Sequence, residues 1–243
     1  MHKVIIIDYG SGNLRSAAKA FERAAEGKDI EILVTDDASQ LATATHIVLP
    51  GVGAFADCMS GLNSTVGMRN ALEKEVLGGQ KPFLGICVGM QLLFEVGHEH
   101  GIHKGLGWIA GEVVKIAARN EERGTSESTS HLVPRASRLK IPHMGWNELS
   151  FTAPDHPLVR GIAHASHAYF VHSFHALCSN PADSVATTDY GQNLTAIVAH
   201  DNIMGTQFHP EKSQSTGLKL IENFLEMGVA GSGCTHAQSD RST

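Results

Sequence analysis

The chain has 243 residues, of which 42% are hydrophobic and 18% are charged, so it is long enough to bury a sizeable core. Its formal net charge of -6 argues against nucleic acid as the main ligand, because nucleic-acid-binding proteins present a broad basic surface. The four cysteines form no CxxC pair, and the apolar run near the N-terminus is too short for a signal segment or a membrane span. We therefore expect a cytoplasmic protein with free thiols that binds neither nucleic acid nor a membrane.

The first half of the chain alternates between strand-like and helix-like segments. Residues 4–7 are a continuous β-branched, apolar run, which is typical of a strand buried on both faces of a parallel sheet. Further strands are predicted over residues 31–35, 46–49 and 82–86, and helices over residues 14–25 and 68–77. This alternation predicts an α/β fold with a central, mostly parallel sheet flanked by helices.

The second half is dominated by strand-like segments with short turns between them, which predict antiparallel hairpins. These segments are residues 108–116, 146–151, 168–174, 185–188, 195–199 and 203–208, and a closing helix is predicted over 217–227. Residues 120–137 are rich in Ser, Thr, Arg and Glu, which indicates a surface insertion. Residues 229–243 are small and polar, which indicates a flexible tail after a single domain over residues 1–228.

The clearest chemical signal is the stretch Gly85-Ile86-Cys87-Val88-Gly89 between a predicted strand and a predicted helix. It has the form of a nucleophile elbow with sulfur in place of oxygen, and its flanking glycines avoid clashes in a tight turn. A helix N-terminus would favour the Cys87 thiolate, and the N–H of Val88 could stabilise an oxyanion. A lone cysteine is more often a core residue, and the other three cysteines have no such setting.

A thiol nucleophile needs a general base, and His209 is the strongest candidate among fifteen histidines. It follows a predicted strand, and Glu211 lies two residues later, close enough to orient the imidazole. Alone, His209 would be read as a surface or capping residue. Together with Cys87 and Glu211 it predicts a catalytic triad.

Two glycine-rich segments and several closely spaced histidines could be mistaken for binding or metal sites, or could contribute to one. Residues 50–55 place Val52 between two glycines, so its peptide could turn and offer a second oxyanion donor, although a plain strand-to-helix turn is the simpler reading. Residues 8–13 lack the third glycine of a dinucleotide site, because Arg15 takes its place. The histidines within residues 98–103 lie in a glycine-rich loop and favour a solvated loop over a metal site. At most one of His172 and His175 is expected to point into a site, since their spacing in a strand puts them on opposite faces.

The motifs at residues 85–91 and 208–211 resemble the signatures of the class I glutamine amidotransferases, G-x-C-x-G-x-Q and x-H-P-E. The resemblance covers roughly residues 3–228 and implies the flavodoxin-like fold of that family, with glutamine as substrate. Residues 8–14, 50–55, 142–147 and 170–174 are in turn similar to the glutaminase subunits of imidazole glycerol phosphate synthases, enzymes of histidine biosynthesis. Only residues 120–137 are longer than that resemblance leads us to expect.

The resemblance also implies roles for individual residues and a partner. Gly53 and Gln91 would line the glutamine pocket, while Ser173 and Phe174 would hold the amino-acid end of glutamine, largely through their backbones. The residues that would face the partner are Asn13, Trp146 and Tyr169. That partner would be a cyclase subunit with a (β/α)8 barrel, bound as a heterodimer. No metal or other cofactor is implied.

Three other functions remain open on the sequence. A stand-alone cysteine hydrolase would share the Cys-His pair, but Gln91 and the loop at residues 50–55 argue against it. A non-catalytic scaffold would not need the intact triad. Another amidotransferase subunit, for instance from anthranilate or guanylate synthesis, is opposed by residues 8–14 and 142–147.

Overall fold

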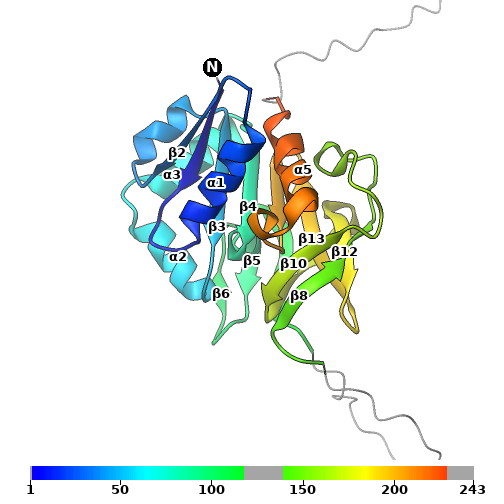
Figure 1. The fold of residues 1–243 in the computed structure, drawn as a ribbon. Coiled ribbons are helices and arrows are strands. Elements are labelled where there is room, and N and C mark those ends of the chain that lie inside the picture. The colour runs from blue at the N-terminus through cyan, green and yellow to red at the C-terminus, as the bar shows by residue number, and fades with distance from the viewer. Residues whose placement is uncertain (1, 118–138, 229–243) are drawn as a thin grey trace, which may run out of the picture.

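The computed structural model describes residues 2–117 and 139–228 (Figure 1). The insertion predicted over residues 120–137 and the tail predicted over 229–243 lie outside the described residues. Within the described ranges, the buried hydrophobic side chains form one continuous core.

The largest sheet has eight strands in the order β2-β1-β3-β4-β14-β13-β12-β9. The first five are parallel, namely β2 (Ile30–Thr35), β1 (His2–Ile7), β3 (His46–Gly51), β4 (Phe83–Cys87) and β14 (Ile203–Thr206). The last three are antiparallel, namely β13 (Asn193–His200), β12 (Ser184–Asp189) and β9 (Ser150–Phe151). The predicted α/β class, with antiparallel strands in the C-terminal half, is confirmed.

Two smaller sheets complete the second half of the chain. One pairs β10 (His167–His172) with β8 (His143–Glu148). The other has the order β11 (Phe174–Cys178), β7 (Ile109–Lys115), β5 (Phe94–Gly97) and β6 (His103–Lys104).

The predictions of one strand over residues 146–151 and one over 168–174 were wrong, because each segment is divided between two sheets. The first segment breaks at Leu149 and the second at Ser173. Sequence patterns report alternation along a strand but not which distant strand it pairs with.

The two longest helices, α1 (Leu14–Ala24) and α5 (Gln214–Leu225), lie side by side in front of the sheet in Figure 1. Their contact includes an edge-to-face pair between Phe21 and Phe224, with ring centroids 6.3 Å apart. The remaining α-helices are α2 (Phe55–Ser64), which the sequence did not predict, α3 (Met68–Leu72) and α4 (Val88–Gln91). The helix predicted over 68–77 continues from α3 as a π-helical turn over Glu73–Gly78. Short 3-10 helices span Ala38–Thr43, Pro157–Val159, Pro181–Asp183 and Pro210–Lys212.

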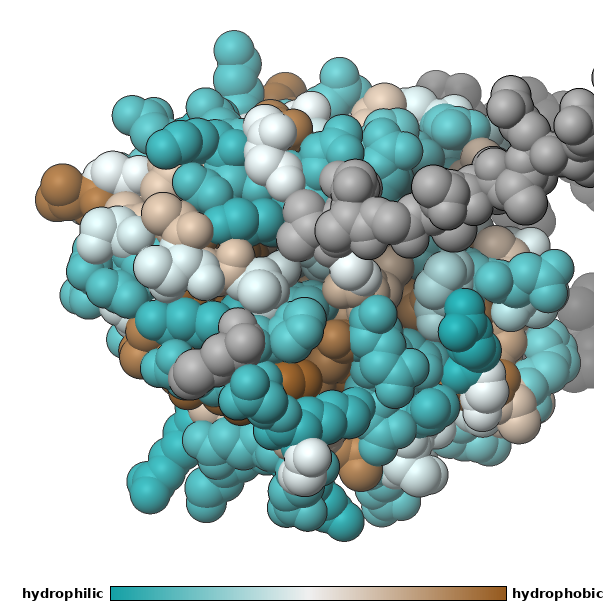
Figure 2. Space-filling view, turned by 90° about the horizontal axis from the view of Figure 1, so that it is seen from above, coloured by the Kyte–Doolittle hydropathy of each residue, from teal (hydrophilic) through white to brown (hydrophobic). Residues whose placement is uncertain are grey.

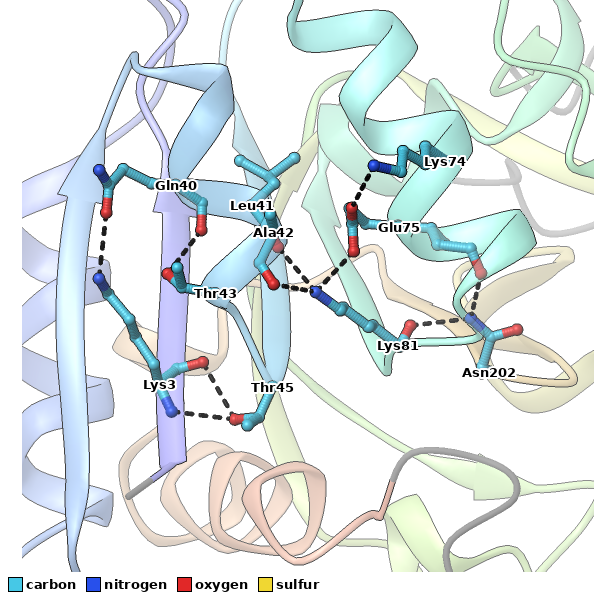
Figure 3. Close-up of polar contacts among 11 residues, drawn as sticks. Lys3, Gln40, Leu41, Ala42, Thr43, Thr45, Lys74, Glu75, Lys81 and Asn202 are labelled. Carbon is cyan, nitrogen blue, oxygen red and sulfur yellow. Dashed lines mark hydrogen bonds and ion pairs between the residues drawn. The ribbon is translucent and has the colours of Figure 1, made fainter.

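Lys81 ties three elements together at the end of the sheet where the parallel strands begin (Figure 3). Its Nζ donates to the carbonyl oxygens of Leu41 and Ala42, both at 2.9 Å, and lies 2.6 Å from Oε2 of Glu75. Asn202 in turn donates to the carbonyl of Lys81 at 2.8 Å. Polar contacts at this end of the sheet therefore join segments about 40 to 120 residues apart.

Figure 2 views the molecule from that same end, where hydrophilic side chains cover most of the surface and apolar ones appear in small, separate places. The exposed Met144 and Trp146 belong instead to β8, at the bottom of Figure 1. Among the described residues, no helix is long and apolar enough to cross a membrane.

Candidate functional site

Cys87 occupies a sharp turn at the carboxyl end of β4. Its φ of 56° and ψ of -111° are strained for a residue other than glycine, as expected for a nucleophile elbow. A Cβ on Gly89 would collide with the carbonyl oxygen of Leu49, and one on Gly85 would come too close to the backbone of Gly89. The predicted reason for the flanking glycines is therefore confirmed: the backbone approaches too closely for side chains.

The helix predicted after Cys87 is present but only about one turn long. α4 covers only Val88–Gln91, and the chain then turns into β5. A helix of one turn has few aligned peptide dipoles, so its macrodipole is weak. Support for a charged sulfur at Cys87 must then come mainly from nearby N–H groups and from His209.

The structure brings His209 and Glu211 together as predicted. His209 Nδ1 lies 2.8 Å from Glu211 Oε1, and both side chains are only 3% exposed. Burial alone would lower the pKa of His209, but its hydrogen bonds and charge interactions with Cys87 and Glu211 outweigh burial and raise the pKa to about 9. With a pKa of about 9 the imidazole is protonated at neutral pH, and it lines the same cavity as the elbow cysteine.

Most of the predicted site residues line one cavity of about 330 Å³, a size typical of small-molecule sites. The predicted residues among its walls are Val52, Gly53, Cys87, Val88, Gln91, Ser173, Phe174 and His209. Glu211 stands behind His209 and does not line this cavity. Residues from β3, β4, β10, β11 and the end of β14 therefore meet at one end of the sheets, as the rule for ligand sites at carboxyl ends of parallel strands leads one to expect.

Gln207 also belongs to this site, although no sequence motif pointed to it. It is fully buried, and its Nε2 lies 3.8 Å from Cys87 Sγ. Its Oε1 accepts a hydrogen bond of 3.0 Å from Gln91 Nε2, which also donates to the Phe174 carbonyl at 3.0 Å. A polar residue two positions before His209, within the segment predicted as a strand and just after the end of β14, was the signal that could have identified it.

Glu99 is a second site residue that was not predicted from the sequence. It brings a carboxylate to the cavity wall, and its Oε2 accepts a hydrogen bond of 2.7 Å from the N–H of Phe55, the first residue of α2. A carboxylate in this position can bind the ammonium group of an amino acid. No spacing in the sequence reveals it, because Glu99 lies in the irregular loop after β5.

The Val52 peptide, predicted as an oxyanion donor, is held by Ser11 in this structure. The N–H of Val52 donates to Ser11 Oγ at 3.3 Å, and Ser11 Oγ donates to the Val52 carbonyl at 2.7 Å. Cys58 Sγ lies 3.2 Å from the same hydroxyl, and burial raises the pKa of this thiol. The oxyanion role therefore requires the Val52 peptide to turn away from Ser11.

The residues predicted to face a partner lie outside the lining of this cavity. Trp146 is 46% exposed, and its ring packs edge-to-face on that of Tyr169 with centroids 5.9 Å apart. Asn13 is exposed at the start of α1 and lines a small cavity that also contacts Val52 and Glu211.

The two groups of histidines noted in the sequence, one at positions 172 and 175 and one within residues 98–103, lie in different parts of the structure. His172 lines the cavity, whereas His175 is buried on the next strand, beyond the break at Ser173. In the loop at residues 98–103, His98 pairs with Glu112 at 2.7 Å. Among residues 2–117 and 139–228, no three histidine, cysteine or acidic side chains are placed to hold a metal ion.

Comparison with known proteins agrees with this geometry. The family described as "Glutamine amidotransferase class-I" matches residues 5–227. "Imidazole glycerol phosphate synthase subunit HisH" of Rhodospirillum rubrum is 52% identical over 225 residues, which cover 92% of this chain and 98% of that protein. The protein of the same name from Agrobacterium fabrum is 51% identical over 228 residues, with the same coverage of both chains.

Solved structures resemble the chain in fold at much lower identity. A putative GMP synthase subunit from Thermoplasma acidophilum has a TM-score of 0.61 and 21% identity, covering 93% of this chain and 92% of its own. A glutamine amidotransferase from Thermotoga maritima has a TM-score of 0.61 and 15% identity, covering 93% and 96%. The fold, the family match and the two relatives agree: this chain belongs to the class I glutamine amidotransferases.

Proposed function

We propose that this chain is the glutaminase subunit of an imidazole glycerol phosphate synthase, which hydrolyses glutamine and passes the ammonia to a cyclase subunit in histidine biosynthesis. The observation that carries the proposal is the cavity in which Cys87 meets a protonated His209 supported by Glu211. The two relatives, which are 51–52% identical to this chain over nearly their whole length, are named as that subunit.

Glutamine hydrolysis begins with attack of the Cys87 thiolate on the side-chain amide carbon. The resulting oxyanion is stabilised by the N–H of Val88 and, once its peptide has turned, by the N–H of Val52. His209 donates its proton to the departing nitrogen, which leaves as ammonia, and a glutamyl thioester remains on Cys87. Glu211 stabilises the imidazolium and holds its ring in place.

The thioester is then cleaved by water. His209 removes a proton from the water molecule, the hydroxyl adds to the thioester carbon, and glutamate leaves as the sulfur recovers its electron pair. Around the reacting atoms, Gly53, Gln91, Ser173 and Phe174 line the pocket. Ser173 and Phe174 are the residues proposed to hold the amino-acid end of glutamine. Glu99 provides the carboxylate that pairs with the α-ammonium group.

The Ser11 contact with Val52 defines a resting state of the isolated chain. While the Val52 N–H donates to Ser11, only one of the two oxyanion donors is in place. One such donor is worth about 3 kcal/mol in the transition state. Turning the peptide when the cyclase has bound its own substrate would restrict ammonia release to the moments when the partner can use it.

The partner binds at the cavity end of the molecule. There β8 exposes Met144 at 62% and Trp146 at 46%, next to Tyr169 and Lys212, whereas the opposite end in Figure 2 is mainly hydrophilic. Large exposed apolar side chains of this kind indicate a protein interface. Direct docking would also let ammonia reach the cyclase without entering water, where it would be protonated to ammonium, which is not a nucleophile.

The test is the complex of this chain with its cyclase partner, assayed with glutamine or with ammonium salts. Cys87→Ala should abolish synthesis of imidazole glycerol phosphate from glutamine and leave synthesis from ammonium intact. Loss of both activities, or failure of the two chains to co-purify, would contradict the proposal. Turnover of γ-glutamyl peptides by the chain alone would favour a stand-alone hydrolase.

A further inference from the structure

Two buried histidines that take no part in the proposed chemistry stand next to the glutamine cavity. His143 on β8 is 2% exposed and His172 at the end of β10 is 6% exposed. Nδ1 of His143 lies 2.9 Å from Nε2 of His172. The ring of His143 is also stacked between Phe170 and Tyr190, at centroid distances of 4.7 and 4.0 Å.

The hydrogen bonds determine where the protons lie. His172 Nδ1 is 2.9 Å from the Phe174 carbonyl, which only accepts, so Nδ1 carries the hydrogen. The Nε2 of a neutral His172 is then an acceptor, and the hydrogen of the next contact must lie on His143 Nδ1. His143 Nε2 becomes the acceptor for Asn147 Nδ2, which is 3.2 Å away.

Asn147 fixes the start of this series independently. Its Oδ1 accepts from the N–H of Glu148 at 2.8 Å, and its Nδ2 also donates to the Asp189 carbonyl at 2.9 Å. These two contacts leave only one orientation for the amide. Burial lowers the pKa of His143 to about 4 and that of His172 to about 3, so both rings are neutral and keep the lone pairs that the series needs.

The series ends at the break between two sheets. His172 and Phe174 flank Ser173, where the chain leaves β10 and enters β11. The Phe174 carbonyl accepts from His172 Nδ1 and from Gln91 Nε2, which binds Gln207 next to Cys87. Ser173, Phe174 and Gln91 all line the cavity.

We propose that Asn147, His143 and His172 form a directional hydrogen-bond relay that positions the Ser173–Phe174 backbone for the amino-acid end of glutamine. The three side chains are positioning residues. Through His172 they fix the Phe174 carbonyl, and the Phe174 backbone belongs to the pocket wall that recognises the substrate. The role assigned to that wall rests on the proposed glutaminase function, whereas the relay itself does not.

The relay can be tested by NMR spectroscopy, without an assay of enzyme activity. In the full chain labelled with 15N-histidine, ring 15N–1H correlation spectra should show His143 and His172 as the Nδ1–H tautomer. His46 is a built-in control, because it is 2% exposed but its Nε2 lies 2.8 Å from the Met227 carbonyl, which requires the Nε2–H tautomer. Signals are assigned by their loss in His143→Phe, His172→Asn and His46→Asn. An Nε2–H tautomer at position 143 or 172 would overturn the relay.

The functional prediction is measured in the complex with the cyclase subunit. His172→Leu removes the donor to Phe174 and should raise KM for glutamine roughly tenfold, with kcat nearly unchanged, since a binding wall acts on substrate and transition state alike. His172→Asn keeps an amide donor near the place of Nδ1 and should restore most of the affinity. His143→Phe preserves the ring stack and should give an intermediate KM.

The control readouts separate this role from a failure to fold and from a failure of the proposed function. Ammonium-dependent synthesis should be unchanged in all three variants if they fold and assemble. Equal KM values for His172→Leu and His172→Asn would contradict the positioning role. If the wild-type complex does not hydrolyse glutamine at all, the proposed function fails. The NMR measurement of the His143 and His172 tautomers then still tests the relay by itself.

Discussion

His209 Nδ1 and Glu211 Oε1 are 2.8 Å apart in a site where both side chains are only 3% exposed. The pKa of His209 is about 9 because hydrogen bonds and charge interactions with Cys87 and Glu211 outweigh the effect of burial. The folded-state pKa lies above the unfolded value of about 6.5, so the folded chain binds an additional proton between these two values. The associated stability is complete below pH 6.5 and is lost as the pH rises through 9.

Glu211→Gln should therefore lower the pKa of His209 and flatten this pH dependence. In the wild type, the contribution of His209 to the free energy of unfolding should diminish as the pH rises from 6.5 through 9. Ring 1H–13C NMR titration of His209 and urea unfolding at several pH values measure the two effects. Glu148→Gln, which alters an exposed pair with His167, is the matched control. An unchanged His209 titration in Glu211→Gln would show that the carboxylate has no such influence.

Ser11→Ala should raise the glutaminase activity of the chain without its partner's ligand. The substitution removes the hydroxyl that binds both the N–H and the carbonyl of Val52, so the peptide can turn more readily. Loss of one or two hydrogen bonds of about 1 kcal/mol each predicts an increase of roughly five- to thirtyfold in basal turnover. Ser64→Ala removes an exposed hydroxyl bound to Ser60 and should change nothing. Equal basal rates in the two variants would reject Ser11 as the restraint.

Gln207→Met should reduce kcat/KM for glutamine roughly tenfold or more. The substitution removes the contact of Nε2 with Cys87 Sγ and leaves the Gln91 amide without its Oε1 acceptor. Methionine is similar in length and apolar, so packing should survive. Gln40→Met is the control, because Gln40 accepts a hydrogen bond from Lys3 in the polar contacts of Figure 3 and does not line the cavity. Steady-state kinetics of the complex with glutamine and with ammonium will show whether the defect is confined to the glutamine reaction.

Gly89→Ala should disrupt the elbow. A Cβ at this position collides with the Leu49 carbonyl, a backbone atom in a buried strand that cannot move aside cheaply. We expect a loss of about 3 kcal/mol or more in stability together with loss of glutaminase activity. Gly78→Ala is the comparison, since a Cβ there meets no atom within 4 Å and should leave the melting temperature nearly unchanged. A fully active, stable Gly89→Ala protein would contradict the close approach.

Lys81→Met should destabilise the fold without altering glutamine kinetics. It removes the ammonium group that donates to two backbone carbonyls and leaves Glu75, whose side chain is 12% exposed, without its closest cation. Breaking such a largely buried pair should cost about 2–3 kcal/mol. Lys74→Met is the control, because Lys74 contacts the same carboxylate at 3.8 Å but is 79% exposed, and should cost less than about 0.5 kcal/mol. Chemical denaturation measures the free energy of unfolding of both variants. Equal losses of stability would mean that burial of the ion pair plays no part.

Features that depend on neighbouring residues were predictable from the sequence. The buried strands of the parallel sheet appear as β-branched runs, and β1 and β3 differ from their predicted ranges only at the ends. The elbow around Cys87 and the His209–Glu211 pair were predictable for the same reason. The glycines that the tight turn needs stand two positions before and after Cys87, and Glu211 stands two positions after His209.

Tertiary structure alone decided the features that join distant parts of the chain. Gln91 and Gln207 are 116 residues apart and His143 and His172 are 29 apart, so no spacing rule relates them. The same cause divided two predicted strands at Leu149 and Ser173, because pairing partners come from elsewhere in the chain. The sequence therefore determined the elbow around Cys87 and the His209–Glu211 pair, through local geometry. The pocket wall, the resting position of Val52 and the histidine relay arise only when packing brings remote backbone and side-chain groups within hydrogen-bonding distance.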